Sequence, residues 1–170
     1  MAAPYHVELL GPTHDRTTFT CGNDTFDRYF RQQAGQDVRR SLTVVYVLVD
    51  SVTSVVAGYY TLSATAIEFA EFAPAVTKRL PRYPTLPATL LGRLARDTRF
   101  RGRGAGEALI LDALKKSLDA SRHVASFAVV VDAIDDEARA FYERYDFSRS
   151  PHQEYRLFLP MATIDKLFTP

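Results

Sequence analysis

The sequence predicts an α/β fold in which a mixed, mostly antiparallel central sheet carries helices on both faces. Two runs rich in β-branched and aromatic residues, 42–49 and 55–63, flank a short polar connection that is typical of a β-hairpin. Strand and helix patterns then alternate in the second half, an order typical of α/β sheets. With 170 residues, of which 46% are hydrophobic, the chain is long enough for one domain with a substantial core.

Six strands are expected, each from a run of apolar or β-branched residues. They are residues 5–10, 42–49, 55–63, 88–96, 127–131 and 155–159. Gly92 interrupts the fourth strand, where we expect a bulge or a close approach of two backbones. The fifth run is almost wholly apolar, which predicts a strand buried on both faces. Pro160 is expected to end the last strand.

Helices are expected where apolar residues recur at helical spacing. They are residues 107–120, 135–144 and, as a short closing helix, 163–168. Asn23 or Asp24 can cap an earlier helix. The stretch 72–87 carries four prolines, so it is expected to be a loop with at most one short helix.

A glycine-rich turn, residues 101–106 with the sequence Arg-Gly-Arg-Gly-Ala-Gly, separates the fourth strand from the long helix. Glycine tolerates positive φ and lets a ligand approach the backbone, while a helix start offers unpaired N–H groups and a positive dipole end. These properties predict a phosphate site. A basic surface turn at a glycine-rich helix start is the alternative that the spacing alone leaves open.

The glycine spacing argues against two common nucleotide-binding motifs. A dinucleotide fingerprint requires a third glycine three positions after Gly104, where this chain has Glu107. A P-loop requires Gly-Lys-Ser/Thr, which does not follow the turn. Positive charge comes instead from Arg99, Arg101 and Arg103.

Composition narrows the functional class. The net charge of +1 creates no global field for nucleic acid, although local arginine clusters can supply one. Cys21 is the only cysteine and is expected to be a buried structural residue, and Asp97 a turn or ion-pair residue. The four histidines lack metal-ligand spacing, so no metal is expected. Because no signal peptide or membrane-length apolar run is visible, a cytoplasmic location is expected.

Two motifs resemble those of the GNAT superfamily of N-acetyltransferases. The glycine-rich turn is similar to its acetyl-coenzyme A motif, Arg/Gln-x-x-Gly-x-Gly/Ala, with Arg101, Gly104 and Gly106 at the defining positions. Residues 138–147 resemble its Ala-x-x-Phe-Tyr-x-x-x-Gly-Phe signature, except that Asp146 stands in place of the glycine. The resemblance implies a single GNAT domain over residues 1–170, with acetyl-coenzyme A (acetyl-CoA) as cosubstrate.

A narrower resemblance covers nearly the whole chain. The segments FTCG (19–22), GYYTLS (58–63), LGRLA (91–95) and RLFLPM (156–161) resemble those of toxin-type GNATs from bacterial type II toxin-antitoxin modules. Members of this group acetylate the α-amine of the amino acid on charged tRNA, which blocks translation. The resemblance implies that activity here, with charged tRNA as substrate and a cognate antitoxin as partner; a homodimer is one expected assembly.

The same resemblance implies roles for individual residues. The coenzyme site is expected to comprise Leu94, Ala95, Arg96, Arg101, Gly102, Arg103, Gly104, Ala105 and Gly106. Backbone N–H groups of the turn would hold the pyrophosphate, and one N–H group of the preceding strand would stabilise the developing oxyanion. Tyr142 is expected to protonate the leaving thiolate. Its alternative role is that of a packing residue.

Candidate tRNA contacts are all basic. They are Arg93, Arg39, Arg40, Lys78 and Arg79, with Arg82 nearby in sequence. A salt bridge is the alternative for Arg93, and a solvated surface is the alternative for the others. Two other functions stay open at this point: a GNAT that acetylates a small-molecule amine or a protein amino group, and a non-catalytic coenzyme-binding module.

Overall fold

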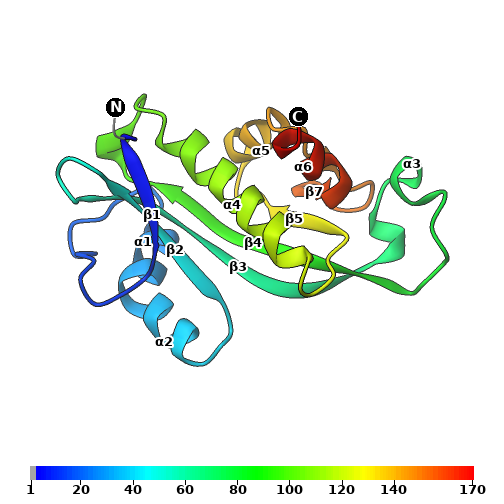
Figure 1. Cartoon of the computed structure of the whole chain (residues 1–170), viewed down its shortest axis with the longest axis horizontal. Helices are drawn as coiled ribbons and strands as arrows, with labels where there is room; N and C mark the ends of the chain where they lie inside the picture. Colours follow the sequence, from blue (N-terminus) through cyan, green and yellow to red (C-terminus); the bar gives the residue numbers. More distant parts are fainter. Residues whose placement is uncertain (1–2) are drawn as a thin grey trace. The chain divides into compact units, whose positions relative to one another are not determined.

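The computed structural model describes residues 3–170 (Figure 1), and its strands form a seven-stranded sheet in the order β1-β2-β3-β4-β5-β7-β6. The strands are β1 (Tyr5–Leu9), β2 (Val44–Asp50), β3 (Val56–Glu68), β4 (Thr85–Arg96), β5 (Ala128–Asp132), β6 (Ser148–Arg149) and β7 (Arg156–Pro160). Only β4 and β5 pair in parallel among the pairs β1·β2, β2·β3, β4·β5, β5·β7 and β6·β7. The mixed, mostly antiparallel α/β sheet is therefore confirmed.

Helical segments lie between the strands and, in the case of α6, after the last strand. The α-helices are α1 (Asp24–Arg28), α2 (Ala34–Arg39), α3 (Pro74–Thr77), α4 (Ala105–Ser121), α5 (Asp136–Glu143) and α6 (Met161–Phe168). The other helical turns are η1 (Tyr29–Gln33, a π-helix), η2 (Phe69–Glu71, 3₁₀) and η3 (Thr98–Phe100, 3₁₀). The Asn23 side chain accepts a hydrogen bond from the Phe26 N–H at 3.0 Å, which confirms it as the cap of α1.

The chain divides into two compact units. The first comprises the described residues up to Ser63 together with Gly92–Ala113, and the second comprises Ala64–Leu91 together with Leu114–Pro170. Strands β3 and β4 and helix α4 each run from one unit into the other. The expectation of a single GNAT domain stays a prediction.

Aromatic rings dominate the core of the first unit. Phe30 stacks on Tyr59 at a centroid distance of 4.2 Å, and Phe19 meets both rings edge-on. Strands β2 and β3 pair antiparallel, as the hairpin pattern predicts. Asp50 closes the connection between them by accepting hydrogen bonds from the backbone and side chain of Thr53.

The core of the second unit is built around β5. Four of the five β5 residues are buried, which confirms the prediction from its apolar run. Phe72 packs on Phe158 at 4.4 Å and on Phe127 at 5.4 Å, so the proline-rich segment is fixed to this core by its first aromatic residue. Within residues 3–170, no helix is both long and apolar enough to span a membrane.

Several boundaries differ from the expected ones. Strand β4 begins at Thr85 and passes through Pro87, so the predicted loop ends earlier than residue 87. Strand β6 is only two residues long and was not predicted, because no run of two residues can show a period. Helix α4 begins at Ala105, two residues before its first expected position, so the last two residues of the glycine-rich turn begin the first turn of the helix.

Candidate active site

The end of strand β4 forms the first part of the site. Its parallel pairing with β5 runs from Ala88 to Leu91, and β5 ends at Asp132, whereas β4 continues to Arg96. Among the described residues, positions 93–96 of β4 therefore have no β5 residue beside them. Leu94, Ala95 and Arg96, the residues expected to face the coenzyme, lie in this stretch.

Gly92 makes the close approach that its position predicts. A Cβ added at Gly92 would lie 2.9 Å from the Thr61 hydroxyl oxygen. The same hydroxyl accepts a hydrogen bond from the Arg93 backbone N–H at 3.0 Å, so a β3 side chain takes the role that a strand carbonyl usually has. This contact of Thr61 was missed, because a sequence does not show which residues face each other across two strands.

Gly58 sets the packing of helix α4. An added Cβ there would lie 2.7 Å from both the carbonyl oxygen of Ala95 and a methyl group of Leu109. Since real Cβ contacts are longer than this, a side chain at residue 58 would push α4 or β4 away. Glycine thus allows the helix that begins at the glycine-rich turn to lie directly against β3.

The glycine-rich turn has the backbone conformation of an anion site. Gly102 and Gly104 have φ of +72° and +77°, and an added Cβ at either position would meet nothing within 4 Å. Of the six N–H groups, those of Arg101 and Arg103 donate to carbonyl groups of η3 at 3.3 and 3.2 Å. Within residues 3–170, the four at positions 102, 104, 105 and 106 have no backbone acceptor. These donors at the start of α4 fit a pyrophosphate.

The flanking arginines differ in their surroundings. Arg99 forms an ion pair with Asp97, with Nη2 to Oδ2 at 2.9 Å, which confirms Asp97 as an ion-pair residue. Arg103 lies over the Phe100 ring at 4.6 Å and is exposed, as is Arg101. Two arginines of the turn therefore remain available to an anion, and Arg99 is occupied.

Tyr142 lies on α5 in the second unit. Asp135 caps this helix by accepting a hydrogen bond from the Ala138 N–H at 2.8 Å. The Tyr142 ring packs edge-on against Phe141 at 5.3 Å and Phe147 at 5.4 Å, and only 6% of the residue is exposed. Burial raises the pKa of Tyr142 above its ordinary value of 10.0, so its hydroxyl keeps the proton that a general acid needs.

The hydroxyl of Tyr142 differs from those of the other buried tyrosines. Tyr29 donates to Asp37 at 2.9 Å, Tyr59 to the Phe26 carbonyl at 2.8 Å, and Tyr60 to Asp112 at 2.5 Å. The Tyr142 hydroxyl has no hydrogen-bond partner among residues 3–170. Unlike Arg93 Nε and Arg96 Nε, it is not a fully buried atom without a partner, so the hydroxyl oxygen reaches the surface of the protein and is open to a ligand.

Asp146 occupies a left-handed backbone position three residues after the end of α5. Its φ is +69°, and the Phe147 N–H bonds back to the Tyr142 carbonyl at 3.3 Å, as in a helix end that glycine usually closes. The superfamily signature has glycine here because glycine adopts positive φ without strain. Asp146 adopts the same left-handed conformation, but its side chain makes that conformation strained.

Asp146→Gly is expected to raise the free energy of unfolding by about 1 kcal/mol, because glycine adopts positive φ without a Cβ clash. Urea denaturation measures the change. Ser54→Gly is a matched control, because Ser54 also has positive φ, 62°, but lies in a hairpin of the other unit. A gain at both positions with unaltered acetyl transfer is expected; a loss of stability in Asp146→Gly would contradict the assignment.

The candidate tRNA contacts fall into both units. Arg93 lies in the first unit, with its guanidinium 3.5 Å from the centre of the Tyr29 ring, and it forms no ion pair among residues 3–170. In the part of the chain that the structure describes, the buried Nε atoms of Arg93 and Arg96 have no hydrogen-bond partner. The other candidates are exposed: Arg39 and Arg40 in the first unit, and Lys78, Arg79 and Arg82 in the second. The salt-bridge alternative for Arg93 is not found.

Cys21 is only partly buried, not fully buried as expected, but it has the properties of an inert thiol. Burial, followed by its hydrogen-bonded neighbour Asp27, raises the pKa of this thiol to about 12. We expect the native protein to react slowly with a thiol reagent near pH 8, and the urea-unfolded protein to react at the rate of a free cysteine. Absorbance of released thionitrobenzoate measures both rates, and equal rates would contradict the assignment.

Two curated relatives resemble this chain over most of its length, although no family model matches it. A probable toxin TacT of Sinorhizobium fredii is 30% identical, over 98% of this chain and 96% of its own. A tRNA-acetylating toxin of Mycobacterium tuberculosis is 33% identical, over 89% of each chain.

Solved structures show the same fold. A tyrosine-to-phenylalanine variant of KacT superposes with a TM-score of 0.90 at 28% identity, over 98% of this chain and 100% of that one. The structure of AtaT complexed with acetyl-methionyl-tRNAfMet superposes with a TM-score of 0.88 at 28% sequence identity. The match covers 97% of this chain and 99% of that one. An AtaT variant bound to the C-terminus of the antitoxin AtaR and to acetyl-CoA superposes with a TM-score of 0.82 at 26% sequence identity. The match covers 99% of this chain and 100% of that one. From its own motifs and these relatives, the chain belongs to the family of GNAT-type toxins.

Proposed function

We propose that this protein transfers the acetyl group of acetyl-CoA to the α-amine of an aminoacyl-tRNA and thereby blocks translation. The observation that supports coenzyme binding is the glycine-rich turn, with two left-handed glycines and four N–H groups that have no backbone acceptor among the described residues 3–170. The tRNA half is supported by the relative that is named a tRNA-acetylating toxin and by the AtaT complex. An acetylated α-amine cannot form a peptide bond, so each modified tRNA is lost to elongation.

The chain's own residues supply binding, orientation and one proton. When bound, acetyl-CoA supplies a thioester as the acetyl donor. The N–H groups of the glycine-rich turn, with Arg101 and Arg103, hold the pyrophosphate by charge-assisted hydrogen bonds. Backbone groups of Leu94, Ala95 and Arg96 orient the acyl end, and an N–H group among them stabilises negative charge on the carbonyl oxygen.

Proton transfer is assigned to Tyr142. Its raised pKa keeps the hydroxyl protonated at neutral pH, and this hydroxyl, which has no hydrogen-bond partner among residues 3–170, can donate its proton to the departing thiolate sulfur. The attacking group needs no strong enzymic base, because an α-amine next to an ester is less basic than a lysine amine. The site therefore needs one well-placed acid and a neutral amine.

Further parts of the proposal follow from the toxin family. Arg93, Arg39, Arg40, Lys78 and Arg79 are proposed to contact the tRNA, through charge that the structure leaves exposed or unpaired. A cognate antitoxin is proposed as protein partner, as AtaR is for AtaT. The location proposed is the cytoplasm, where charged tRNA is available.

Inducible expression tests the proposed function directly. Wild-type protein is expected to arrest growth and to leave N-acetylated aminoacyl-tRNA, which mass spectrometry of total tRNA detects. Tyr142→Phe should do neither, although it accumulates to the same level. Growth arrest without any acetylated tRNA would overturn the tRNA assignment and indicate a protein amino group or a small amine as acceptor.

A further inference from the structure

A fully buried carboxylate lies directly before the glycine-rich turn. Asp97 follows the last residue of β4 and caps η3, and its side chain is 0% exposed. It accepts four hydrogen bonds: from the backbone N–H of Thr20 and of Arg99, and from Nε and Nη2 of Arg99, at 2.8–3.1 Å. Four donors satisfy a buried charge that would otherwise be very unfavourable, so this position is built for a carboxylate.

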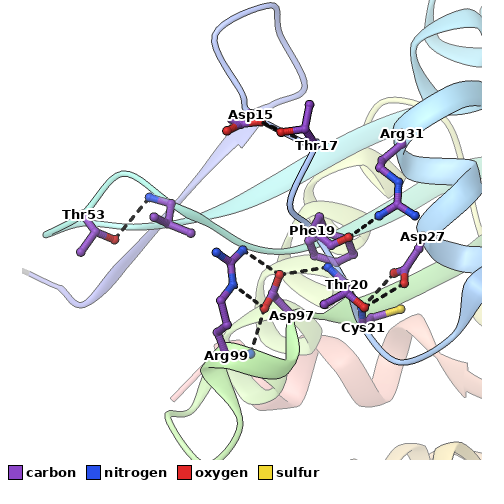
Figure 2. A network of polar contacts seen from close by, with 11 residues as sticks. Asp15, Thr17, Phe19, Thr20, Cys21, Asp27, Arg31, Thr53, Asp97 and Arg99 are labelled. Carbon is purple, nitrogen blue, oxygen red and sulfur yellow. Dashed lines mark hydrogen bonds and ion pairs between the residues drawn. The ribbon is translucent and has the colours of Figure 1, made fainter.

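Arg99 is held by this carboxylate at two points. Both of its bonding nitrogens lie 2.9 Å from the Asp97 oxygens, in the two-bond geometry that fixes a guanidinium in one orientation (Figure 2). The hydrogen bonds to Asp97, and then its negative charge, raise the pKa of Arg99 above the ordinary value of an arginine. We call this pair of residues, Asp97 and Arg99, the Asp97 clamp. Within it, the Asp97 carboxylate neutralises the charge of Arg99 before any ligand binds.

The clamp also joins the turn to the N-terminal segment. The Thr20 carbonyl accepts a hydrogen bond from the Thr98 N–H at 2.9 Å, so Thr20 bonds to Asp97 and to the residue after it. The Thr20 hydroxyl and the Cys21 N–H in turn donate to Asp27 of α1, another buried carboxylate, as Figure 2 shows. A continuous chain of bonds thus runs from α1 to the start of the turn.

A second contact holds the turn from its other side. The Tyr5 hydroxyl donates to the Arg103 carbonyl at 2.9 Å, and the Tyr5 ring meets the buried Phe100 ring at 6.2 Å. Phe100 belongs to η3, whose capping residue is Asp97. The backbone on both sides of Gly102 is therefore anchored, although the glycine itself has no steric neighbour.

We propose that Asp97 is a positioning residue that holds the glycine-rich turn in its anion-binding geometry and withdraws Arg99 from ligand binding. The proposal rests on the proposed function, because it takes the pyrophosphate of coenzyme A as the anion. It divides the arginines of this region by task. Arg101 and Arg103 face the ligand, and Arg99 serves neither the coenzyme nor the tRNA.

Asp97→Asn tests the proposal, because it keeps the shape of the side chain and removes its charge. Kd and KM for acetyl-CoA are expected to rise about tenfold, since a displaced turn no longer aligns its N–H groups. The kcat at saturating acetyl-CoA should stay within twofold of wild type. With S-acetylpantetheine, a donor that lacks the pyrophosphate, the variant and the wild type should react equally. A general loss of structure would instead lower both rates.

A double-mutant cycle separates a clamp from a ligand contact. If Asp97 and Arg99 act as one unit, Asp97→Asn combined with Arg99→Gln should cost no more affinity for acetyl-CoA than either change alone. Additive losses would show that Arg99 binds the coenzyme itself and would overturn its assignment. Asp132→Asn is the matched control, because it breaks another two-bond pair, with Arg156, in the other unit; it should leave Kd unchanged.

Calorimetry measures the binding of acetyl-CoA without tRNA. It therefore tests the proposed function and the positioning role of Asp97 independently of each other. Wild type that does not bind acetyl-CoA would refute the proposed function. Wild type and a folded Asp97→Asn variant that bind equally well would refute only the positioning role. If Asp97→Asn does not fold, Arg99→Lys takes its place, because it keeps the charge but not the two-bond geometry. A selective rise in KM for acetyl-CoA is then expected, and an unchanged KM overturns the proposal.

Discussion

Replacing Tyr142 by phenylalanine is expected to slow acetyl transfer by about 10²-fold, while acetyl-CoA binds almost as before. Phenylalanine keeps the ring that packs against Phe141 and Phe147 and removes only the hydroxyl group. The packing and the acid roles of Tyr142 therefore predict different results. Stopped assays with aminoacyl-tRNA measure kcat, and calorimetry measures Kd for acetyl-CoA.

Tyr155→Phe is a suitable control for the loss of a tyrosine hydroxyl. Its hydroxyl donates to Asp136 of α5 at 2.9 Å, so the change removes a hydrogen bond to the same helix without touching Tyr142. Its kcat should match that of wild type. Turnover of Tyr142→Phe equal to that of Tyr155→Phe would leave Tyr142 with a packing role only.

The dependence of the acetyl-transfer rate on pH is a second test of Tyr142 as the general acid. Because burial raises the pKa of Tyr142 above 10.0, the acid stays protonated throughout the neutral and mildly alkaline range. The rate is expected to rise with pH as the acceptor amine loses its proton, with no falling limb below pH 10.0. An acceptor with an amide in place of the tRNA ester avoids hydrolysis during the measurement. A bell-shaped profile with a descending limb near neutrality would point to another acid.

Gly104→Val is expected to weaken acetyl-CoA binding at least about tenfold, equivalent to about 1.4 kcal/mol. Gly104 has φ of +77°, where a β-branched residue is strained, and relief of that strain would turn the N–H groups at the start of α4 away from the ligand. Calorimetric titration with acetyl-CoA measures the loss.

Gly104→Asn separates backbone strain from bulk at the same position. Asparagine is similar in size to valine but tolerates the left-handed region, and the added Cβ meets no atom within 4 Å. It should keep most of the affinity that valine loses. Equal losses would mean that side-chain bulk blocks the ligand, and unaltered affinity in both variants would remove the turn from the coenzyme site.

Local patterns predicted most of the fold, because each needed only a few neighbouring residues. The hairpin of β2 and β3, the buried β5 and the amphipathic α4 and α5 follow from hydrophobic period and turn residues. The π-helical turn at Tyr29–Gln33 and strand β6 do not, since neither has a local signal that differs from its surroundings.

Some features of the candidate site could be predicted from the sequence, and others could not. Glycine spacing located the turn, and the structure adds the positive φ of Gly102 and Gly104. The Asp97 clamp and the Thr61 hydroxyl depend on residues far apart in the chain, with Thr20 and Asp97 separated by 77 positions. Pairings at that distance come from tertiary packing, which no local pattern shows.

Recognition through main-chain N–H groups has a consequence for how such a protein can diversify. Every amino acid except proline has the backbone N–H group that positions 102, 104, 105 and 106 are proposed to use, so the proposed coenzyme site constrains conformation more than side-chain chemistry. Charged side chains such as those of Arg93 and Arg40 carry the contacts proposed for the acceptor. Randomising those arginines should therefore change which amine is acetylated while the affinity for the acetyl donor persists, which makes this scaffold suitable for selecting new acceptors.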